Sequence, residues 1–117
     1  MRNHDLSIKI GELIGVPNVS MRGIINPWQD FIIGSVLAGF REKNVTTVVL
    51  DIAGLSFAEK ESENAIIQTL KISSVYFNLH IATKGKFLET ILNADLGDNV
   101  QAYKSTEEIA RHIMAEG

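Results

Sequence analysis

The sequence predicts an α/β domain with a mainly parallel sheet of about four to five strands, an antiparallel N-terminal edge and four helices. Short segments rich in β-branched residues alternate along the chain with longer segments whose apolar residues recur every three or four positions. Strands that alternate with helices form parallel sheets joined by right-handed crossovers. The first two strand-like segments have no helix between them, which favours a hairpin at one edge of the sheet.

The N-terminal part of the chain contains this hairpin and the first helix. Ile8 and Ile10 alternate in a strand over 7–11, and Pro17-Asn18 is a turn signal before a strand over 18–25. Asn26 can cap a helix that begins at Pro27 and runs to about Lys43. We expect its apolar stripe to lie in the core. This stripe consists of Trp28, Phe31, Ile32, Val36, Leu37 and Phe40.

The segment 46–57 is the most informative stretch of the chain. It has three consecutive apolar residues, Val48 to Leu50, as expected for a strand that is covered on both faces. We expect the strand to end at Asp51, Gly54 to bend the chain sharply, and Phe57 to anchor the loop. In α/β domains, ligands and partners bind at the carboxyl ends of strands. The loop 53–58 is therefore the first place to look for function.

The C-terminal half continues the alternation. A helix is predicted from about 61 to 75, a strand over 77–82, a helix after the turn 83–86, and a strand over 100–103. The last helix opens with the spacing of a capping box, Ser105 to Glu108. The apolar faces of these helices are formed by Ala65, Ile66, Ile67, Leu70, Ile72 and Val75, by Phe87, Leu88, Ile91 and Leu92, and by Ile109, Ile113 and Met114.

Composition predicts a single domain over 1–117, with residues 1–6 flexible. The chain has no cysteine, which excludes a disulfide framework and a thiolate nucleophile. Its net charge is −3 and its basic residues are scattered, which argues against nucleic-acid binding. The start has no secretory signal, and the longest apolar run, 31–40, is too short to span a bilayer. We expect a cytoplasmic protein with no cofactor and no metal.

Several segments, taken in this order, resemble the STAS domain of anti-sigma factor antagonists and sulfate transporters. The segments are 21–24, 48–57, 96–100 and 105–110, and the resemblance covers nearly the whole chain from Val19 onward. The stretch 48–57 is the most specific of them. The resemblance implies a STAS-like fold and a non-enzymatic role in signal transduction and transcription regulation. It also implies a regulatory protein partner, either an anti-sigma kinase-like protein or a sister STAS protein.

The chain departs from the family at the position that the family's kinase phosphorylates. Aligned without gaps from Gly54, the family's Asp-Ser-Ser-Gly run becomes 59–62, and the phosphoacceptor position holds Glu61. Ser62 is one residue late, and one residue turns a helical side chain by about 100°. Two hypotheses follow. Either Glu61 imitates a phosphoserine in part, or the kinase circuit is absent and Glu59, Glu61 and Glu63 serve as acids at a helix start. We favour the second.

Two other classes of function remain open. A receiver-type phosphoacceptor domain would use Asp51, Thr83 and Lys104, with Mg²⁺ held by oxygen ligands. The segment 11–26, however, lacks the pair of acids and the helix that a receiver needs there. The second alternative is a domain of the same fold that binds a nucleotide or a lipid. Homo-oligomer formation also remains open.

Single residues are mostly explained by structural roles. Asp51 should accept hydrogen bonds from loop amides, and His80 should be a core or sheet-face histidine rather than a metal ligand. His112 should lie on an exposed helix face, and His4 in a mobile terminus. The turn Lys84-Gly85-Lys86 is a weak candidate for an anion site and more typical of a solvated turn.

The prediction for the binding site rests on the loop and the helix start that follows it. Ser56 has no histidine base, so nucleophilic catalysis is unsupported and no catalytic residue is predicted. We expect the chain to bind a regulatory protein, with support from the loop after Ile25. The predicted partner-binding residues are Gly54, Ser56, Phe57, Glu59, Lys60, Glu61 and Ser62.

Overall fold

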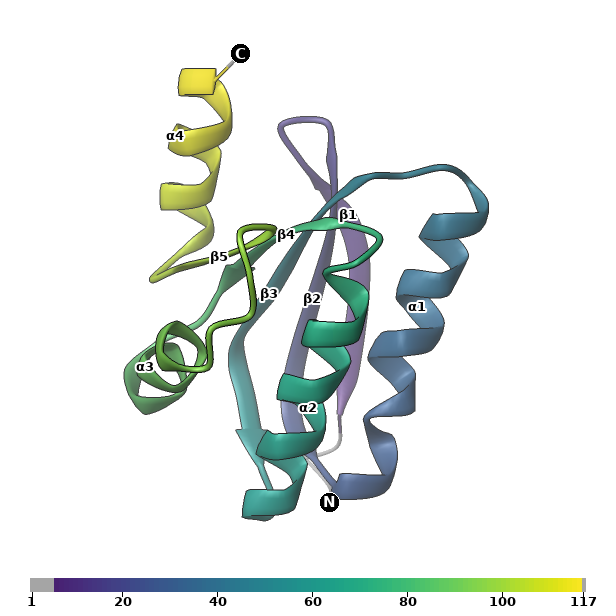
Figure 1. Cartoon of the computed structure of the whole chain (residues 1–117), viewed down its shortest axis with the longest axis vertical. Helices are drawn as coiled ribbons and strands as arrows, with labels where there is room; N and C mark the ends of the chain where they lie inside the picture. The colour runs from purple at the N-terminus through teal and green to yellow at the C-terminus, as the bar shows by residue number, and fades with distance from the viewer. Residues whose placement is uncertain (1–5, 117) are drawn as a thin grey trace.

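The computed structural model describes residues 6–116 (Figure 1). The elements follow the order expected for alternating strands and helices, with a short 3₁₀ helix, η1, added before the first α-helix. The strands are β1 (Ser7–Leu13), β2 (Val16–Ile25), β3 (Thr47–Phe57), β4 (Asn78–Ala82) and β5 (Val100–Tyr103). The helices are η1 (Pro27–Gln29), α1 (Phe31–Glu42), α2 (Lys60–Ser73), α3 (Gly85–Asn93) and α4 (Thr106–Glu116).

The strands form one five-stranded sheet in the spatial order β1-β2-β3-β4-β5. β1 and β2 pair antiparallel, and the other neighbouring pairs are parallel. The predicted fold class is therefore confirmed, including the antiparallel N-terminal edge. Residues 1–5 lie outside the described residues. They include His4 and most of the segment predicted to be flexible.

The two faces of the sheet are covered unequally. Val48, Leu50 and Ile52 of β3 point into the main core, which also contains buried residues of α1, α2 and α3. Val49 points to the other face, where it packs with Ala82 and with Ile109 of α4. Alternate residues of a strand point to opposite faces, so three helices cover one face and α4 alone covers the other. Figure 1 shows α4 well separated from α1.

The N-terminal hairpin turns earlier than the sequence predicted. Ile14 and Gly15 form the turn, with φ values of 51° and 79°. Two consecutive left-handed residues suit a two-residue hairpin, since their twist matches that of the flanking strands. Pro17 and Asn18, predicted as the turn, instead belong to β2 and pair with Glu12 and Gly11. The turn prediction was wrong because an isoleucine with positive φ carries no sequence signal.

The central strand is longer than predicted. β3 does not end at Asp51 but continues to Phe57, and its last residues pair with β2 up to the pair Ile25–Phe57. The register shifts between Ser20 and Arg22 of β2, where β3 holds one extra residue. This bulge carries the strand past the end of β4, which pairs only as far as Asp51. The segment 53–57, predicted as loop, is thus a strand that pairs along the β2 side.

The first helix also differs from its prediction. The chain forms the 3₁₀ turn η1 and then α1, instead of one continuous helix from Pro27. Trp28 and Phe31, predicted to be buried, are 68% and 63% exposed, while Ile33 and Leu37 are buried. The predicted end of the helix is confirmed, because Asn44 has φ 63° just after α1.

Four further apolar residues predicted to be inside are exposed. Ile72 and Val75, at and just beyond the end of α2, are 64% and 74% exposed. Leu92 of α3 and Met114 of α4 are 62% and 64% exposed. Their helices bury narrower stripes than the sequence suggested, because each helix contacts the sheet along one side only.

The predicted capping interaction of the last helix is present with a shifted partner. The amide of Glu108 donates to Ser105 Oγ at 3.2 Å. The carboxylate of Glu108 accepts from the amide of Lys104 at 3.1 Å, one residue before the expected position. The first contact satisfies an amide that the first turn of the helix leaves free, and the second fixes the chain just before the helix.

Candidate functional site

The predicted partner-binding residues lie at the end of β3 and the start of α2. Gly54 and Ser56 are exposed in the last part of β3. Glu59, Lys60 and Glu61 are exposed at the first turn of α2. The amide of Ala58 donates to the carbonyl of Ile25 at 3.0 Å, which fixes the chain between the two elements.

Glu61 and Ser62 are adjacent in sequence but differ completely in exposure. Glu61 is exposed, whereas Ser62 is 1% exposed. Within residues 6–116, Ser62 Oγ has no hydrogen-bond partner. The side chain of Ser62 is therefore not part of the accessible surface.

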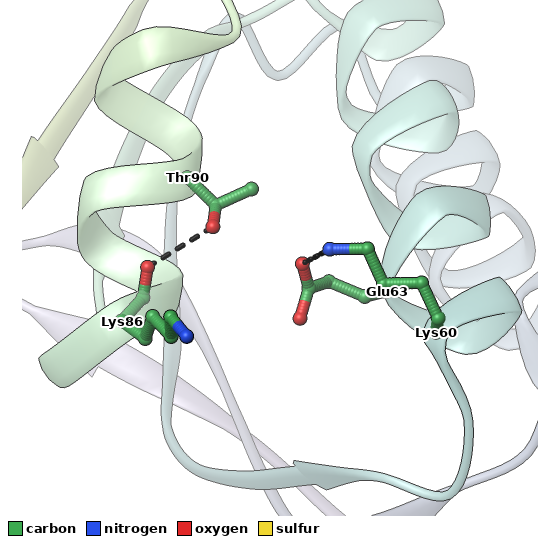
Figure 2. A network of polar contacts seen from close by, with 4 residues as sticks. All are labelled: Lys60, Glu63, Lys86 and Thr90. Atoms are coloured by element: carbon green, nitrogen blue, oxygen red, sulfur yellow. Dashed lines mark hydrogen bonds and ion pairs between the residues drawn. The ribbon is translucent and has the colours of Figure 1, made fainter.

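The first turn of α2 carries a local ion pair. Lys60 Nζ lies 3.0 Å from Glu63 Oε1, with the lysine side chain 75% and the glutamate side chain 20% exposed. Figure 2 shows this pair on α2 and, on α3, the hydroxyl of Thr90 donating to the carbonyl of Lys86. Exposed pairs of this kind are worth little in stability. Lys60 thus partly neutralises the acids of this turn, and Glu61 is exposed beside the pair.

Phe57 anchors the end of β3, as predicted. Its ring lies 4.6 Å from the ring of Phe87, with the two planes tilted by 47°. Phe87 is buried, while Phe57 is half-buried and packs at the border of the core. This contact ties the end of β3 to α3, where β4 no longer covers the strand.

Gly54 has a different structural reason from the predicted bend. It pairs with Arg22 across the sheet, and a Cβ built on Gly54 would lie 3.0 Å from Arg22 Cγ. The glycine therefore allows the side chain of Arg22 to cross the strand. The predicted sharp bend at this position was wrong, since the chain continues as β3.

Two aromatic residues extend the predicted surface. η1, which contains Trp28, lies against α2, and Figure 1 shows α1 and α2 starting at the same end of the molecule. Trp28 and Phe31 are each about two-thirds exposed. We define the β3–α2 surface as Gly54, Ser56, Phe57, Glu59, Lys60 and Glu61 together with Trp28 and Phe31. Both residues were predicted to lie on a buried stripe, which is why they are absent from the predicted contact residues.

Solved structures share this fold with the chain. One is an anti-sigma factor antagonist from Mycobacterium paratuberculosis, with a TM-score of 0.75, 11% identity and 97% of each chain covered. The chain has a STAS-like fold. A DUF3478-family protein from Shewanella loihica, described as having a SpoIIAA-like fold, matches with a TM-score of 0.61 and 11% identity over 92% of this chain and 93% of its own. No family model and no curated protein matches the sequence.

The STAS-like topology excludes the receiver alternative. A receiver has a doubly wound parallel sheet with strand order 2-1-3-4-5, whereas this sheet has sequential order and an antiparallel first pair. Asp51 has a structural role: its carboxylate accepts from the amide of Ala53 at 3.3 Å and from Ser20 Oγ at 3.4 Å. Thr83 is buried and Lys104 is exposed. Asp51 thus accepts from a nearby amide as predicted, but it supports the bulge in β3 and not a turn at Gly54.

A second polar group of the STAS-like domain lies on the opposite face, under α4. His80 is 8% exposed, and its Nδ1 lies 3.0 Å from the hydroxyl of Tyr103. Burial lowers the pKa of His80 below its ordinary value of 6.5, His112 lowers this pKa further, and Glu116 acts in the opposite direction. The prediction that His80 is a sheet-face histidine is confirmed. The prediction that His112 lies on an exposed face was wrong, because its ring lies 5.9 Å from that of His80.

A signal for this contact was present in the sequence. His112 follows Ile109 by three positions, and residues three apart lie on the same face of a helix. Since Ile109 is buried against the sheet, His112 points inward as well.

Residues 6–116 show neither a metal-binding group nor a helix that could span a membrane. Within residues 6–116, no group of three or more histidine and acidic side chains is placed to hold a metal ion. Over the same residues, no helix is both long enough and apolar enough to cross a membrane.

Lys84 and Lys86 are exposed on either side of Gly85, which begins α3 with φ 64°.

Proposed function

We propose that this STAS-like domain is a non-enzymatic regulatory module that binds a protein partner through the β3–α2 surface. The partner would be an anti-sigma kinase-like protein or a second STAS-like protein. The anti-sigma factor antagonist that shares the fold over 97% of both chains supports this class of partner. Localisation in the cytoplasm and a role in transcription regulation are parts of the same proposal.

The exposed aromatic pair is the observation that carries the proposal. Trp28 is 68% and Phe31 63% exposed beside a helix start that carries exposed charges. Interfaces concentrate their binding energy in a few residues, and tryptophan is prominent among them. Large aromatics ringed by charged residues are typical of such interfaces, in which an apolar centre is surrounded by a polar rim. The β3–α2 surface has this composition.

The position of Glu61 favours a surface that does not depend on a kinase. Glu61 cannot be phosphorylated, and the neighbouring hydroxyl of Ser62 is buried. A carboxylate carries one charge and two acceptor oxygens, fewer than a phosphate group. Acids near a helix N-terminus also stabilise the helix by about 0.3–1 kcal/mol each. Glu61 therefore has a structural role in α2 and, in the proposal, offers a fixed negative charge to the partner.

Charge reversal at Glu61 tests the proposal. We expect Glu61→Lys to weaken capture of the partner from a lysate of the native host at least about tenfold, which corresponds to about 1.4 kcal/mol. Glu107→Lys is the matched control, since Glu107 is the exposed second residue of α4 and lies across the sheet. Both substitutions remove an acid from the first turn of a helix, so both should lower stability by a similar amount.

A second pair of variants tests the aromatic centre. Trp28→Ala should abolish capture, whereas Tyr76→Ala, which removes an aromatic side chain 47% exposed beyond the other end of α2, should not. Equal capture by wild type, Glu61→Lys and Trp28→Ala, with unchanged melting, would refute the β3–α2 surface. Glu61→Ser removes the charge without reversing it: weakened capture by this variant would show that the partner requires the negative charge, and unchanged capture would show that Glu61→Lys acts by repulsion alone.

Small-ligand binding is the weaker candidate. A groove of about 280 Å³ lies between α1 and α2 and is lined by Leu37, Arg41, Ile72 and Tyr76 among others. This volume is just below the usual range of about 300–1,000 Å³ for ligand sites. A thermal-shift panel of nucleotides and lipids tests it, because a ligand at a hundred times its dissociation constant adds about 2.7 kcal/mol of stability.

A further inference from the structure

Three aromatic rings join α4 to the sheet. His80 of β4, Tyr103 of β5 and His112 of α4 have ring centroids between 5.7 and 5.9 Å apart. We call these three residues the imidazole–phenol cluster. Beside it, His112 Nε2 lies 3.2 Å from Glu116 Oε2 on the same helix. The β3–α2 surface uses none of these residues, so the cluster needs a separate explanation.

The hydrogen bonds of the cluster assign one tautomer to His80, with Gln101 Oε1 as the final acceptor. The hydroxyl of Tyr103 donates its single proton to Gln101 Oε1 at 2.6 Å. The tyrosine oxygen must therefore accept from His80 Nδ1, 3.0 Å away. Neutral His80 carries its proton on Nδ1, and Nε2 is the atom that takes up a proton in acid. Protonation thus leaves the bond to Tyr103 intact and adds a charge to a side chain that is 8% exposed.

The apolar contact that holds α4 is small. Ile109 is the buried residue of α4, packed with Val49 and Ala82. Ile113 and Leu13 add partly buried contacts. Elements with few buried apolar contacts open locally at lower free energy than the rest of a domain. The contacts of the His112 ring with the rings of His80 and Tyr103 therefore add to the few contacts that keep α4 docked.

The charged groups around His80 come from several elements. A cleft beside His80 is lined by Asp98 from the loop before β5 and by Glu116 from α4. β2 and β3 contribute the uncharged residues Val16 and Thr47 to the same cleft. His112 faces His80 from α4 and Tyr103 faces it from β5. His112 disfavours a positive charge on His80, whereas Glu116 favours it.

We propose that protonation of His80 releases α4 from the sheet, so that the domain opens locally in mildly acidic solution. While α4 is docked, burial is the main cause that holds the pKa of His80 below 6.5, and the neighbouring His112 is the second. Once α4 has moved away, the ring is solvated and returns toward that ordinary value, so the open state binds the proton more readily. As the pH falls below about 6.5, opening becomes more favourable. Release of α4 uncovers Val49 and Ala82.

Hydrogen exchange at two pH values tests this switch without any partner. Amide exchange of the whole chain is measured at about pH 7.5 and 5.5 and corrected for the intrinsic pH dependence of exchange. We expect residues 109–114 of α4 to lose protection at the lower pH, while Val48 to Leu50 of β3 stay protected. In His80→Phe, which keeps an aromatic ring, the difference between the two pH values should disappear.

A conservative variant on the surface keeps the test decisive if His80→Phe docks α4 poorly. Glu116→Gln removes the charge that favours protonated His80 in the docked state, so the acid-induced loss of protection should increase. Glu107→Gln is the same substitution at the far end of α4 and should leave the difference between the two pH values unchanged. Three outcomes would each overturn the proposal. The first is equal protection of α4 at both pH values, and the second is a loss of protection across the whole domain at once. The third is the same acid-induced loss of α4 protection in Glu116→Gln as in Glu107→Gln.

Discussion

Ser62→Ala should stabilise the domain, although most substitutions of buried residues destabilise a protein. The hydroxyl of Ser62 is 1% exposed and has no hydrogen-bond partner within residues 6–116. A buried polar group without a partner costs about 1–3 kcal/mol. Alanine also has a helix propensity about 0.5 kcal/mol better than serine. The atom-sized void left behind offsets part of this, so we expect a net gain of about 1–2 kcal/mol.

Ser35→Ala separates the two contributions. Ser35 is exposed within α1, so its replacement changes helix propensity without removing a buried hydroxyl. It should gain only about 0.5 kcal/mol. Urea unfolding of both variants measures the difference, and the melting temperature of Ser62→Ala should rise by about 3–5 °C per kcal/mol for a domain of this size. A gain no larger than that of Ser35→Ala would show that the hydroxyl of Ser62 is satisfied and would refute the reasoning.

Three other predictions concern the packing and the electrostatics. Gly54→Ala should lower the free energy of unfolding by about 0.5–1.5 kcal/mol, because its Cβ would lie 3.0 Å from Arg22 Cγ. In an Arg22→Ala background the loss should be much smaller. Equal losses in the two backgrounds of this double-mutant cycle would contradict the contact. Leu70→Ala should lower the free energy of unfolding in urea by about 2–5 kcal/mol, because the side chain of Leu70 is fully buried. Leu92→Ala should lower it by less than about 0.5 kcal/mol, because Leu92 is 62% exposed. The midpoint of urea unfolding should fall as the pH decreases below about 6.5. The reason is that the pKa of His80 is lowered in the folded state, so the unfolded chain binds the proton first. An unchanged midpoint between about pH 7.5 and 5.5 would contradict this prediction.

The alternation of strands and helices was predictable because it depends on local patterns. The run Val48 to Leu50 identified the central strand, and the predicted strand over 100–103 coincides with β5. The left-handed residue Asn44 marked the end of α1 correctly. Each of these features depends on a few neighbouring residues, whose propensities and periodicity are visible in the sequence.

The end of β3 was not predictable in this way. Asp51 and Gly54 are typical of a loop, yet the chain continues as a strand to Phe57. The pairing with β2 and the bulge opposite Arg22 determine this extension, and both depend on residues about thirty positions away. Strand pairing satisfies backbone amides that a loop would leave to water, and this tertiary gain exceeds the weak local preference.

The exposure of Trp28 decides where the candidate site lies, and the helical phase explains it. Each residue of an α-helix turns by about 100°, so Trp28 and Leu37, nine positions apart, would lie about 180° apart on one continuous helix. The buried residues of α1 are Ile33 and Leu37. Continued backward with the same period, their face leaves Trp28 and Phe31 on the other side, and both are exposed. The predicted stripe was therefore too wide for one face of a helix, with or without the break at η1. The partner contact that we propose depends on this outward face.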